Sequence, residues 1–212
     1  FIEDQQDEGY AKPAGSTEQS DLDETIKDGV KKRLPWLILL LFLGMIVSTV
    51  VGLFESVVAE IAIVVCFQSL ILDMAGNVGT QSLAVTIRLL VDENISTKDK
   101  LKFILKELNI GLSNGTILGL LSFLFIGFYI MIAKNRPFMD AFILSGCVGV
   151  SLFVAMVFSS LVGVVIPMFF HKIKVDPAVA SGPLITTIND LVAVVTYYGL
   201  AWLLLVRFFH VH

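Results

Sequence analysis

Long apolar runs separated by short polar segments dominate the chain after residue 34. A helix needs about 20 residues, at about 1.5 Å per residue, to cross a hydrocarbon core about 30 Å thick. Runs of at least that length cover 35–54, 57–91, 109–133, 138–170 and 180–206. The pattern therefore predicts an all-α membrane protein with five transmembrane helices, whose odd number places the two termini on opposite sides.

Polar segments interrupt the second and the fifth of these runs. The second is too long for one straight crossing and contains AGNVGTQS at 75–82, where two glycines permit an unwound backbone that lines a cavity. In the fifth, Gly182 and Pro183 precede Asp190 by one to two turns, and a proline-loosened turn frees carbonyl oxygens. We expect both helices to be locally broken, with a close-packing hinge and a simple kink as the alternatives.

Composition and charge agree with a membrane protein. Hydrophobic residues make up 56% of the chain, charged residues only 16%, and the mean hydropathy of +0.83 argues against a water-soluble enzyme. The net charge of −4 argues against a nucleic-acid surface. The apolar composition makes a lipid bilayer the expected surroundings.

The polar residues concentrate at the start of the chain and suggest a division into four parts. These are a disordered polar head (1–20), a cytoplasmic amphipathic helix (21–34), the membrane domain (35–207) and a tail (208–212). Because the chain opens at Phe1 without a methionine, we expect it to be a piece of a longer protein.

Basic residues predict the orientation, because cytoplasmic loops collect Lys and Arg. With the N-terminus inside, only Lys134, Arg136 and Arg207 of the fifteen basic residues lie outside. The other twelve are Lys12, Lys27, Lys31, Lys32, Arg33, Arg88, Lys98, Lys100, Lys102, Lys106, Lys172 and Lys174. The sequence thus predicts a cytoplasmic N-terminus and a C-terminus outside.

Acidic residues inside the predicted spans are candidate functional groups, because a charge in the bilayer costs a few kcal/mol. Asp190 lies near the middle of the fifth span, Asp73 precedes the glycines of the second, and Glu60 lies near the outer end of the second. No Lys or Arg precedes Arg207 in the fifth span, so a cation from solution can supply the missing charge. A neutral acid bonded to a neighbouring helix is the alternative, and an interfacial position explains Glu60 equally simply.

Oxygen-bearing residues accompany these acids and indicate which ions they would bind. If the polar segments of the two helices face one another, a path through the membrane is lined by carbonyl, amide and hydroxyl oxygens. Such a lining, without Cys or His, favours Mg²⁺, Ca²⁺, Mn²⁺ or alkali ions over soft metals. The candidate site comprises Asp190, Asn189, Thr186, Gly182, Pro183, Asp73, Gly76, Asn77, Gly79 and Thr80, with Glu60 as a weaker member.

Three segments resemble a known family. DMAGNVGTQS at 73–82 is similar to the signature of the MgtE magnesium channels, and DPAVASGPLITTINDLVAVVTYYGLA at 176–201 is similar to their last helix. KKRLPWL at 31–37 resembles the entry into their first transmembrane helix. The likeness extends over about residues 21–207.

The resemblance implies a homodimer with an Mg²⁺ path along its two-fold axis. By this resemblance, Asp190 of each protomer holds a largely hydrated Mg²⁺, and Gly76, Asn77 and Thr80 match the pore-side turn of the second helix. Gly182 and Pro183 match the entry of the last helix. The family often has a small residue where Asp73 stands and can have Asn where Gly182 stands, so Mn²⁺ or another divalent cation is an alternative cargo.

The family also implies a multi-pass protein of the bacterial plasma membrane and cytosolic regulatory domains that this chain lacks. A non-enzymatic magnesium channel is therefore the expected function. The rival is a transporter coupled to H⁺ or Na⁺, in which the two aspartates exchange ions. An intramembrane hydrolase is disfavoured, because Gly111-x-Ser113-x-Gly115 has no base nearby and Gly111, Gly115 and Gly119 form a helix-packing ridge.

Overall fold

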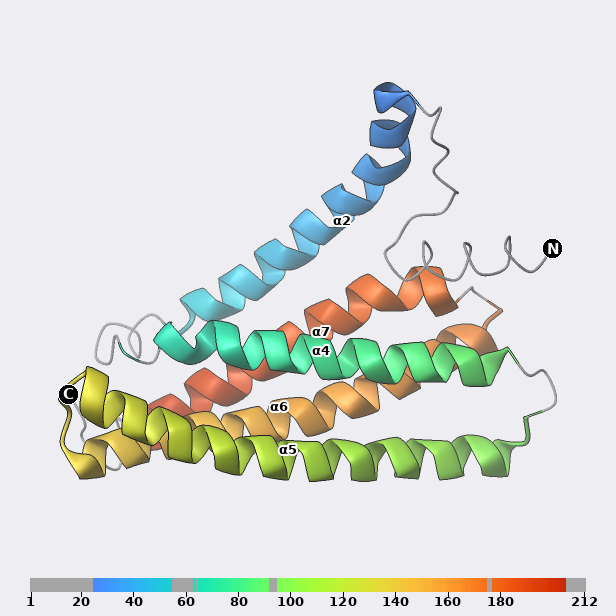
Figure 1. Cartoon of the computed structure of the whole chain (residues 1–212). Coiled ribbons are helices and arrows are strands. Elements are labelled where there is room, and N and C mark those ends of the chain that lie inside the picture. Colours follow the sequence, from blue (N-terminus) through green and yellow to red (C-terminus); the bar gives the residue numbers. More distant parts are fainter. Residues whose placement is uncertain (1–24, 55–62, 64, 92–94, 175–176, 205–212) are drawn as a thin grey trace.

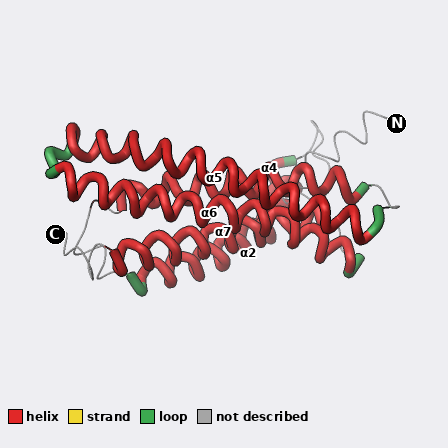
Figure 2. Tube along the Cα trace, turned by 90° about the horizontal axis from the view of Figure 1, so that it is seen from below, coloured by secondary structure: helices red, strands yellow, loops and turns green. Residues whose placement is uncertain are grey.

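The computed structural model describes residues 25–54, 63, 65–91, 95–174 and 177–204. All regular structure in these ranges is helical, which confirms the predicted all-α class (Figures 1 and 2). The helices are α2 (Ile26–Gly52), α4 (Val65–Leu90), α5 (Thr97–Ala133), α6 (Phe138–Lys172) and α7 (Pro177–Ala201).

Four helical segments are long and apolar enough to cross a membrane, which supports a multi-pass membrane protein. They are Ile26–Gly52, Thr97–Ala133, Phe138–Lys172 and Leu184–Leu204. The helix α4 is not among them, although it packs lengthwise in the bundle. Its polar middle, from Asp73 to Ser82, lowers its hydropathy, and this is the segment in which the candidate residues of α4 lie.

The helix α6 is the centre of the bundle and packs against α4, α5 and α7. Small and hydroxyl residues on α6 allow this close packing, because Ser145, Ser151, Ser159, Ser160 and Gly163 are all buried. By contrast, α2 contains no buried residue and packs mainly against α7, from which it extends away from the bundle (Figure 1).

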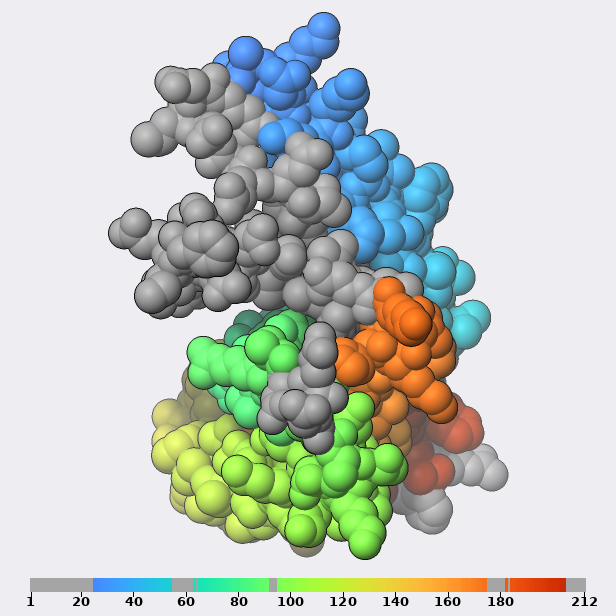
Figure 3. Space-filling view, turned by 90° about the vertical axis from the view of Figure 1, so that its right-hand side faces the viewer, coloured from blue at the N-terminus to red at the C-terminus, as the bar shows by residue number. Residues whose placement is uncertain are grey.

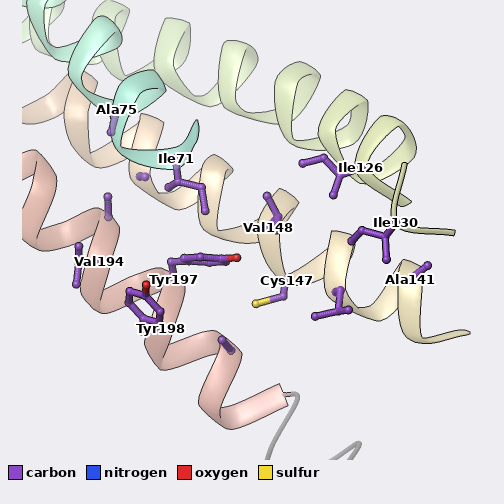
Figure 4. Close-up of a cluster of buried hydrophobic side chains, with 14 residues drawn as sticks. Ile71, Ala75, Ile126, Ile130, Ala141, Cys147, Val148, Val194, Tyr197 and Tyr198 are labelled. Carbon is purple, nitrogen blue, oxygen red and sulfur yellow. The ribbon is translucent and has the colours of Figure 1, made fainter. Parts of the chain in front are cut away.

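A cluster of buried side chains near the end of α7 joins the four bundled helices (Figure 4). The cluster includes Tyr197 and Tyr198 of α7, Ile71 of α4, Val148 of α6 and Ile130 of α5. The polar tip of Tyr198 does not remain unpaired, because its hydroxyl donates to Oε1 of Gln68 at 2.6 Å. This cluster fixes how α7 lies against α4.

A ridge of glycines joins α5 to α6 and confirms the helix-packing interpretation of Gly111, Gly115 and Gly119. All three are buried. A Cβ placed on Gly119 would lie 2.9 Å from the carbonyl oxygen of Gly149 on α6, which is closer than real Cβ atoms approach. The absence of side chains at these positions therefore lets the two backbones touch.

Two predicted boundaries differ from the structure. The amphipathic segment and the first span form one helix, which begins after the Thr25 N-cap and contains Pro35. The helix α5 begins at Thr97, twelve residues before the predicted start at Asn109, because Ser96 caps it by accepting from the Asp99 backbone N–H at 3.2 Å. The predicted head at 1–20 and tail at 208–212 lie outside the described residues.

The predicted breaks in the second and fifth spans are wrong. Residues 65–90 and 177–201 are helical throughout. A continuous helix satisfies its own backbone hydrogen bonds, whereas an unwound segment needs other partners at membrane depth. The glycine at position 79 serves close packing instead: it is buried, and a Cβ on Gly163 of α6 would lie 2.6 Å from the Gly79 carbonyl oxygen.

Candidate functional site

One face of α4 carries three of the predicted site residues in an exposed row. Asp73, Asn77 and Thr80 are spaced by four and three residues, which places them on successive turns of the same face. All three are exposed, and Gly76 beside them is partly exposed. The Thr80 hydroxyl donates to the Asn77 carbonyl oxygen at 2.9 Å, so its proton is engaged while its oxygen can still accept a hydrogen bond.

The matching residues of α7 are Thr186 and Asp190, which lie one turn apart. Thr186 is exposed and Asp190 is partly exposed, so a carboxylate in a helix of mostly apolar residues retains access to its surroundings. The Thr186 hydroxyl donates to the Gly182 carbonyl oxygen at 3.1 Å. That carbonyl is therefore occupied, and it is not a free ligand of the kind predicted for a loosened turn.

Asn189 and Gly79 lie in a buried junction, and the exposed row does not include them. Asn189 is only 2% exposed. A Cβ on Gly79 would overlap the Asn189 amide and would lie 2.9 Å from Oγ of Ser159, so α4, α6 and α7 meet at this point. The Ser159 hydroxyl donates to the Ala75 carbonyl oxygen in the same junction.

The junction sets the register between the two polar rows. Because α4 and α7 run in opposite directions (Figure 1), the Asn189–Gly79 contact places Asp190 about level with Val78, one residue from Asn77 and two from Thr80. Asp73 lies six residues from Gly79, or about 9 Å along the axis.

The exposed row of α4 faces away from the buried side of that helix. Asp190 lies about 100° around α7 from the buried Asn189, and the exposed residues of α4 lie opposite its buried ones, such as Ala75 and Ser82. The polar segments of α4 and α7 therefore lie at the same level of the bundle, and both helices are intact there.

Neither polar atom of the Asn189 side chain has a hydrogen-bond partner among the described residues. An unpaired buried amide lowers the stability of the folded protein by about 1–3 kcal/mol, so packing alone does not explain an asparagine at this position. Asn189 is adjacent to Asp190 in the chain and in contact with α4. It therefore links the position of the carboxylate to the position of the α4 row.

Sequence reasoning missed a second buried polar cluster, around Glu107 of α5. This carboxylate is only 6% exposed, and the Ser82 hydroxyl of α4 donates to its Oε2 at 3.0 Å. The Ser160 hydroxyl of α6 donates to the Glu107 carbonyl oxygen at 2.8 Å. A signal was present, because Glu107 lies four residues before Gly111 and so continues the buried ridge toward the N-terminal end of α5.

The described residues contain no group of three or more His, Cys, Asp or Glu side chains that could hold a metal ion. One carboxylate from α7 and one from α4, supplemented by amide and hydroxyl oxygens, form too sparse a ligand set to strip an ion of its water. Such a set suits outer-sphere binding of a hydrated cation, the mode that Mg²⁺ adopts when it retains several waters. Glu60 and the Pro183 side chain lie outside the described residues.

Comparison with known proteins identifies relatives of the chain. The profile of the MgtE family, described as a divalent cation transporter, matches residues 68–200. The chain is 36% identical over 195 residues to the magnesium transporter MgtE of Bacillus subtilis, and 38% identical over 200 residues to that of Enterococcus faecalis. It is 34% identical over 175 residues to that of Thermus thermophilus.

These alignments cover 92%, 94% and 82% of the chain but only 41%, 42% and 36% of the relatives. The chain therefore spans about two fifths of the length of the proteins that it matches. The matched region includes Asp73, Asn77, Thr80, Thr186 and Asp190.

Proposed function

The chain belongs to the MgtE family of divalent cation transporters, and from this membership and the geometry of α4 and α7 we propose that it conducts Mg²⁺ across a cell membrane. The relatives are named magnesium transporters. A transporter moves an ion without chemical conversion, so we assign no enzymatic activity. The observation that carries the proposal is the exposed row of Asp73, Asn77 and Thr80 on α4, at the level of the partly exposed Asp190 on α7.

A membrane environment makes this row informative. A carboxylate that faces hydrocarbon costs about 2.5–3.5 kcal/mol even on the lower experimental scales. Asp73 is exposed and Asp190 partly exposed in the single chain, so the face must meet water or polar groups. Pairing two chains through their α4–α7 faces places all of these groups around an aqueous path. We therefore propose a homodimer, with the path on its two-fold axis.

The chemistry of such a path follows from how strongly Mg²⁺ holds its water. Mg²⁺ prefers octahedral oxygen coordination and dehydrates reluctantly. Two Asp190 carboxylates, one from each protomer, supply charge, while Asn77, Thr80 and Thr186 offer hydrogen-bond acceptors to the bound waters. Selection then depends on the size of the hydrated ion, because the path would hold Mg²⁺ with its water shell. Mn²⁺ is the divalent ion most similar in ligand preference.

The proposed topology has five crossings, including α4, with the N-terminus in the cytoplasm of a bacterial cell. Basic residues near the N-terminal ends of α2 and α5 support this orientation. The N-terminal turns of α2 then extend into the cytoplasm, where they can connect to cytosolic regulatory parts.

Reconstitution in liposomes tests the function. Mg²⁺ entry is recorded with an internal fluorescent indicator at fixed voltages, without a proton or Na⁺ gradient, for the unchanged chain, Asp190→Asn and Asp140→Asn. Asp140 lies in the first turn of α6, away from the proposed path. The Asp140→Asn variant therefore loses one charge, as Asp190→Asn does, and serves as the matched control. We expect Asp190→Asn to reduce the Mg²⁺ flux at least a hundredfold, while Asp140→Asn retains the flux of the unchanged chain.

Other results would overturn parts of this proposal. Equal flux from Asp190→Asn would remove the carboxylate from the mechanism. Flux that appears only with an imposed H⁺ or Na⁺ gradient would favour the coupled transporter, in which Asp190 and Asp73 exchange ions. A monomeric mass for an active chain would exclude the axial path.

A further inference from the structure

The outer face of α5 begins with a polar stripe that the transport path does not use. Lys102, Lys106, Asn109 and Ser113 recur every three or four residues, which aligns them along one side of the helix. All four are exposed, and they lie opposite the side on which Glu107 and the glycine ridge are buried. Figure 3 shows α5, in yellow-green, with its outer surface open at the lower edge of the molecule.

The stripe contains a shallow groove of about 590 Å³. It is lined by Lys102, Leu105, Lys106, Asn109, Ile110, Ser113 and Asn114. Within the described part of the chain, the polar side chains among these residues make no hydrogen bond or ion pair. The groove thus offers two ammonium groups and several uncommitted hydrogen-bonding groups to a ligand.

The length of α5 places this groove at the edge of the bilayer. Its 37 residues extend about 55 Å, whereas the hydrocarbon core is about 30 Å thick and needs about 20 residues. Beyond Ser113 the residues that continue the stripe are apolar, because Ile117, Leu120, Leu124 and Phe128 are exposed on the same side toward the end at Ala133. Counting about 20 residues back from Ala133 reaches residue 114, so the groove lies at the headgroup level.

We propose that the groove binds the headgroup of an anionic phospholipid in the leaflet that contains the N-terminal end of α5. The phosphate accepts hydrogen bonds from the ammonium groups of Lys102 and Lys106, as basic residues beside membranes attract anionic lipids. Asn109 and Ser113, one to two turns deeper, are placed to bond the glycerol and ester oxygens. Leu105 and Ile110 flank the groove and contact the first carbons of the acyl chains.

Charge and depth favour a lipid over a protein partner. The groove carries two cations and no acid, which complements a phosphate. It lies where α5 leaves the hydrocarbon, at the depth of headgroups, and its polarity decreases toward the membrane centre as a phospholipid's does. The proposal is independent of transport, because it requires neither the aqueous path nor the dimer.

Native mass spectrometry of the whole chain in detergent tests the proposal. Phosphatidylglycerol and phosphatidylcholine with identical acyl chains are titrated into the unchanged protein, Lys102→Gln/Lys106→Gln, and the control Lys100→Gln/Lys134→Gln. The control removes the same charge from positions outside the groove. We expect tighter binding of phosphatidylglycerol to the unchanged protein and the control, and a loss of about tenfold or more in the groove variant.

A third variant, Asn109→Leu, keeps both charges and should weaken phosphatidylglycerol binding a few-fold, provided that its circular dichroism remains that of the unchanged chain. Equal binding of the two lipids, or equal losses from groove and control variants, would overturn the proposal. So would displacement of the lipid by millimolar glycerophosphate, since the groove would then be a site for a free anion. Dimer dissociation in the groove variant would indicate a second copy as the occupant.

Discussion

Two regions of the bundle use small and polar residues for opposite purposes. Between α5 and α6, glycines at 111, 115 and 119 are buried and bring two backbones into contact. On α4, Asp73, Asn77 and Thr80 occupy successive turns but remain exposed, beside the partly exposed Asp190 of α7. The first arrangement completes a contact within the chain, whereas the second leaves oxygen ligands uncovered. The difference shows that composition alone does not separate structural from functional glycine-rich segments.

The largest effect on stability is expected where two backbones touch. In Gly119→Ala the new Cβ would lie 2.9 Å from the Gly149 carbonyl oxygen, and a backbone atom cannot rotate away. Overpacking of this kind costs about 1–3 kcal/mol, and this position should be near the upper end. Thermal unfolding in detergent, followed by circular dichroism, should show a clear decrease in Tm.

The α2 variant Gly44→Ala is the matched control, because nothing lies within 4 Å of its added Cβ. Its Tm should equal that of the unchanged chain or exceed it. Mg²⁺ flux per folded Gly119→Ala molecule should remain that of the unchanged chain. A selective loss of flux would contradict the purely structural assignment of the α5–α6 contact.

A smaller effect is expected at the α4–α7 junction, because the obstructing group there is a side chain. A Cβ on Gly79 would overlap the Asn189 amide and press on Ser159. The Asn189 side chain can rotate, but it is only 2% exposed, so rotation requires its packed neighbours to shift. We expect Gly79→Ala to lose about 1–2 kcal/mol of stability and, unlike Gly119→Ala, to reduce Mg²⁺ flux.

Gly76→Ala is a close control, on the same helix and one turn away, with nothing within 4 Å of the added Cβ. Its stability should be unchanged within about 0.5 kcal/mol. If Gly76→Ala and Gly79→Ala changed stability equally, the junction would not be what fixes α7 on α4.

The sequence predicted much of this comparison and missed the part that depends on three-dimensional contacts. The length of the apolar runs predicted the all-helical class, and the four-residue spacing of the glycines predicted a helix-packing ridge on α5 but not that α6 is its partner. The sequence also grouped Asp73, Asn77, Thr80 and Asp190 as candidate site residues, and the structure leaves the three on α4 exposed along an intact helix. Glycine, however, permits both an unwound backbone and close helix packing. At Gly79 the contact with Asn189 of α7 shows that close packing applies, and this contact is visible only in the structure.

Glu107 was missed for a related reason. An acid near the end of a helix, among lysines, is typical of a solvated face, and its burial depends on Ser82 and Ser160 from two other helices. Neither serine is identifiable as its partner without the packing of α4, α5 and α6.

For substitutions of Glu107 we expect a change in stability of intermediate size. Glu107→Ala removes the carboxylate acceptor of the Ser82 hydroxyl, leaves only the longer contact to Oγ of Ser160 at 3.4 Å, and opens a small cavity, so we expect a loss of about 1–2 kcal/mol in stability. Glu107→Gln keeps an oxygen acceptor and a similar volume, and its Tm should lie close to that of the unchanged chain. If Glu107→Gln were as unstable as Glu107→Ala, a charge requirement would have to replace hydrogen bonding as the explanation.

The smallest effect on stability, and the sharpest test of the comparison, is expected from Asp73→Asn. Asp73 is exposed, and within the described residues its side chain contributes no hydrogen bond, so its substitution should change stability by no more than about 0.5 kcal/mol. In the proposed path, however, loss of this charge from both protomers removes an attraction that favours divalent over monovalent cations. The ratio of Mg²⁺ to Na⁺ flux in liposomes should therefore fall several-fold, and more at low than at high ionic strength, because salt screens the exposed charge. An unchanged ratio would mean that the α4 row faces something other than the ion path, since no packing role remains to explain an exposed carboxylate in this helix.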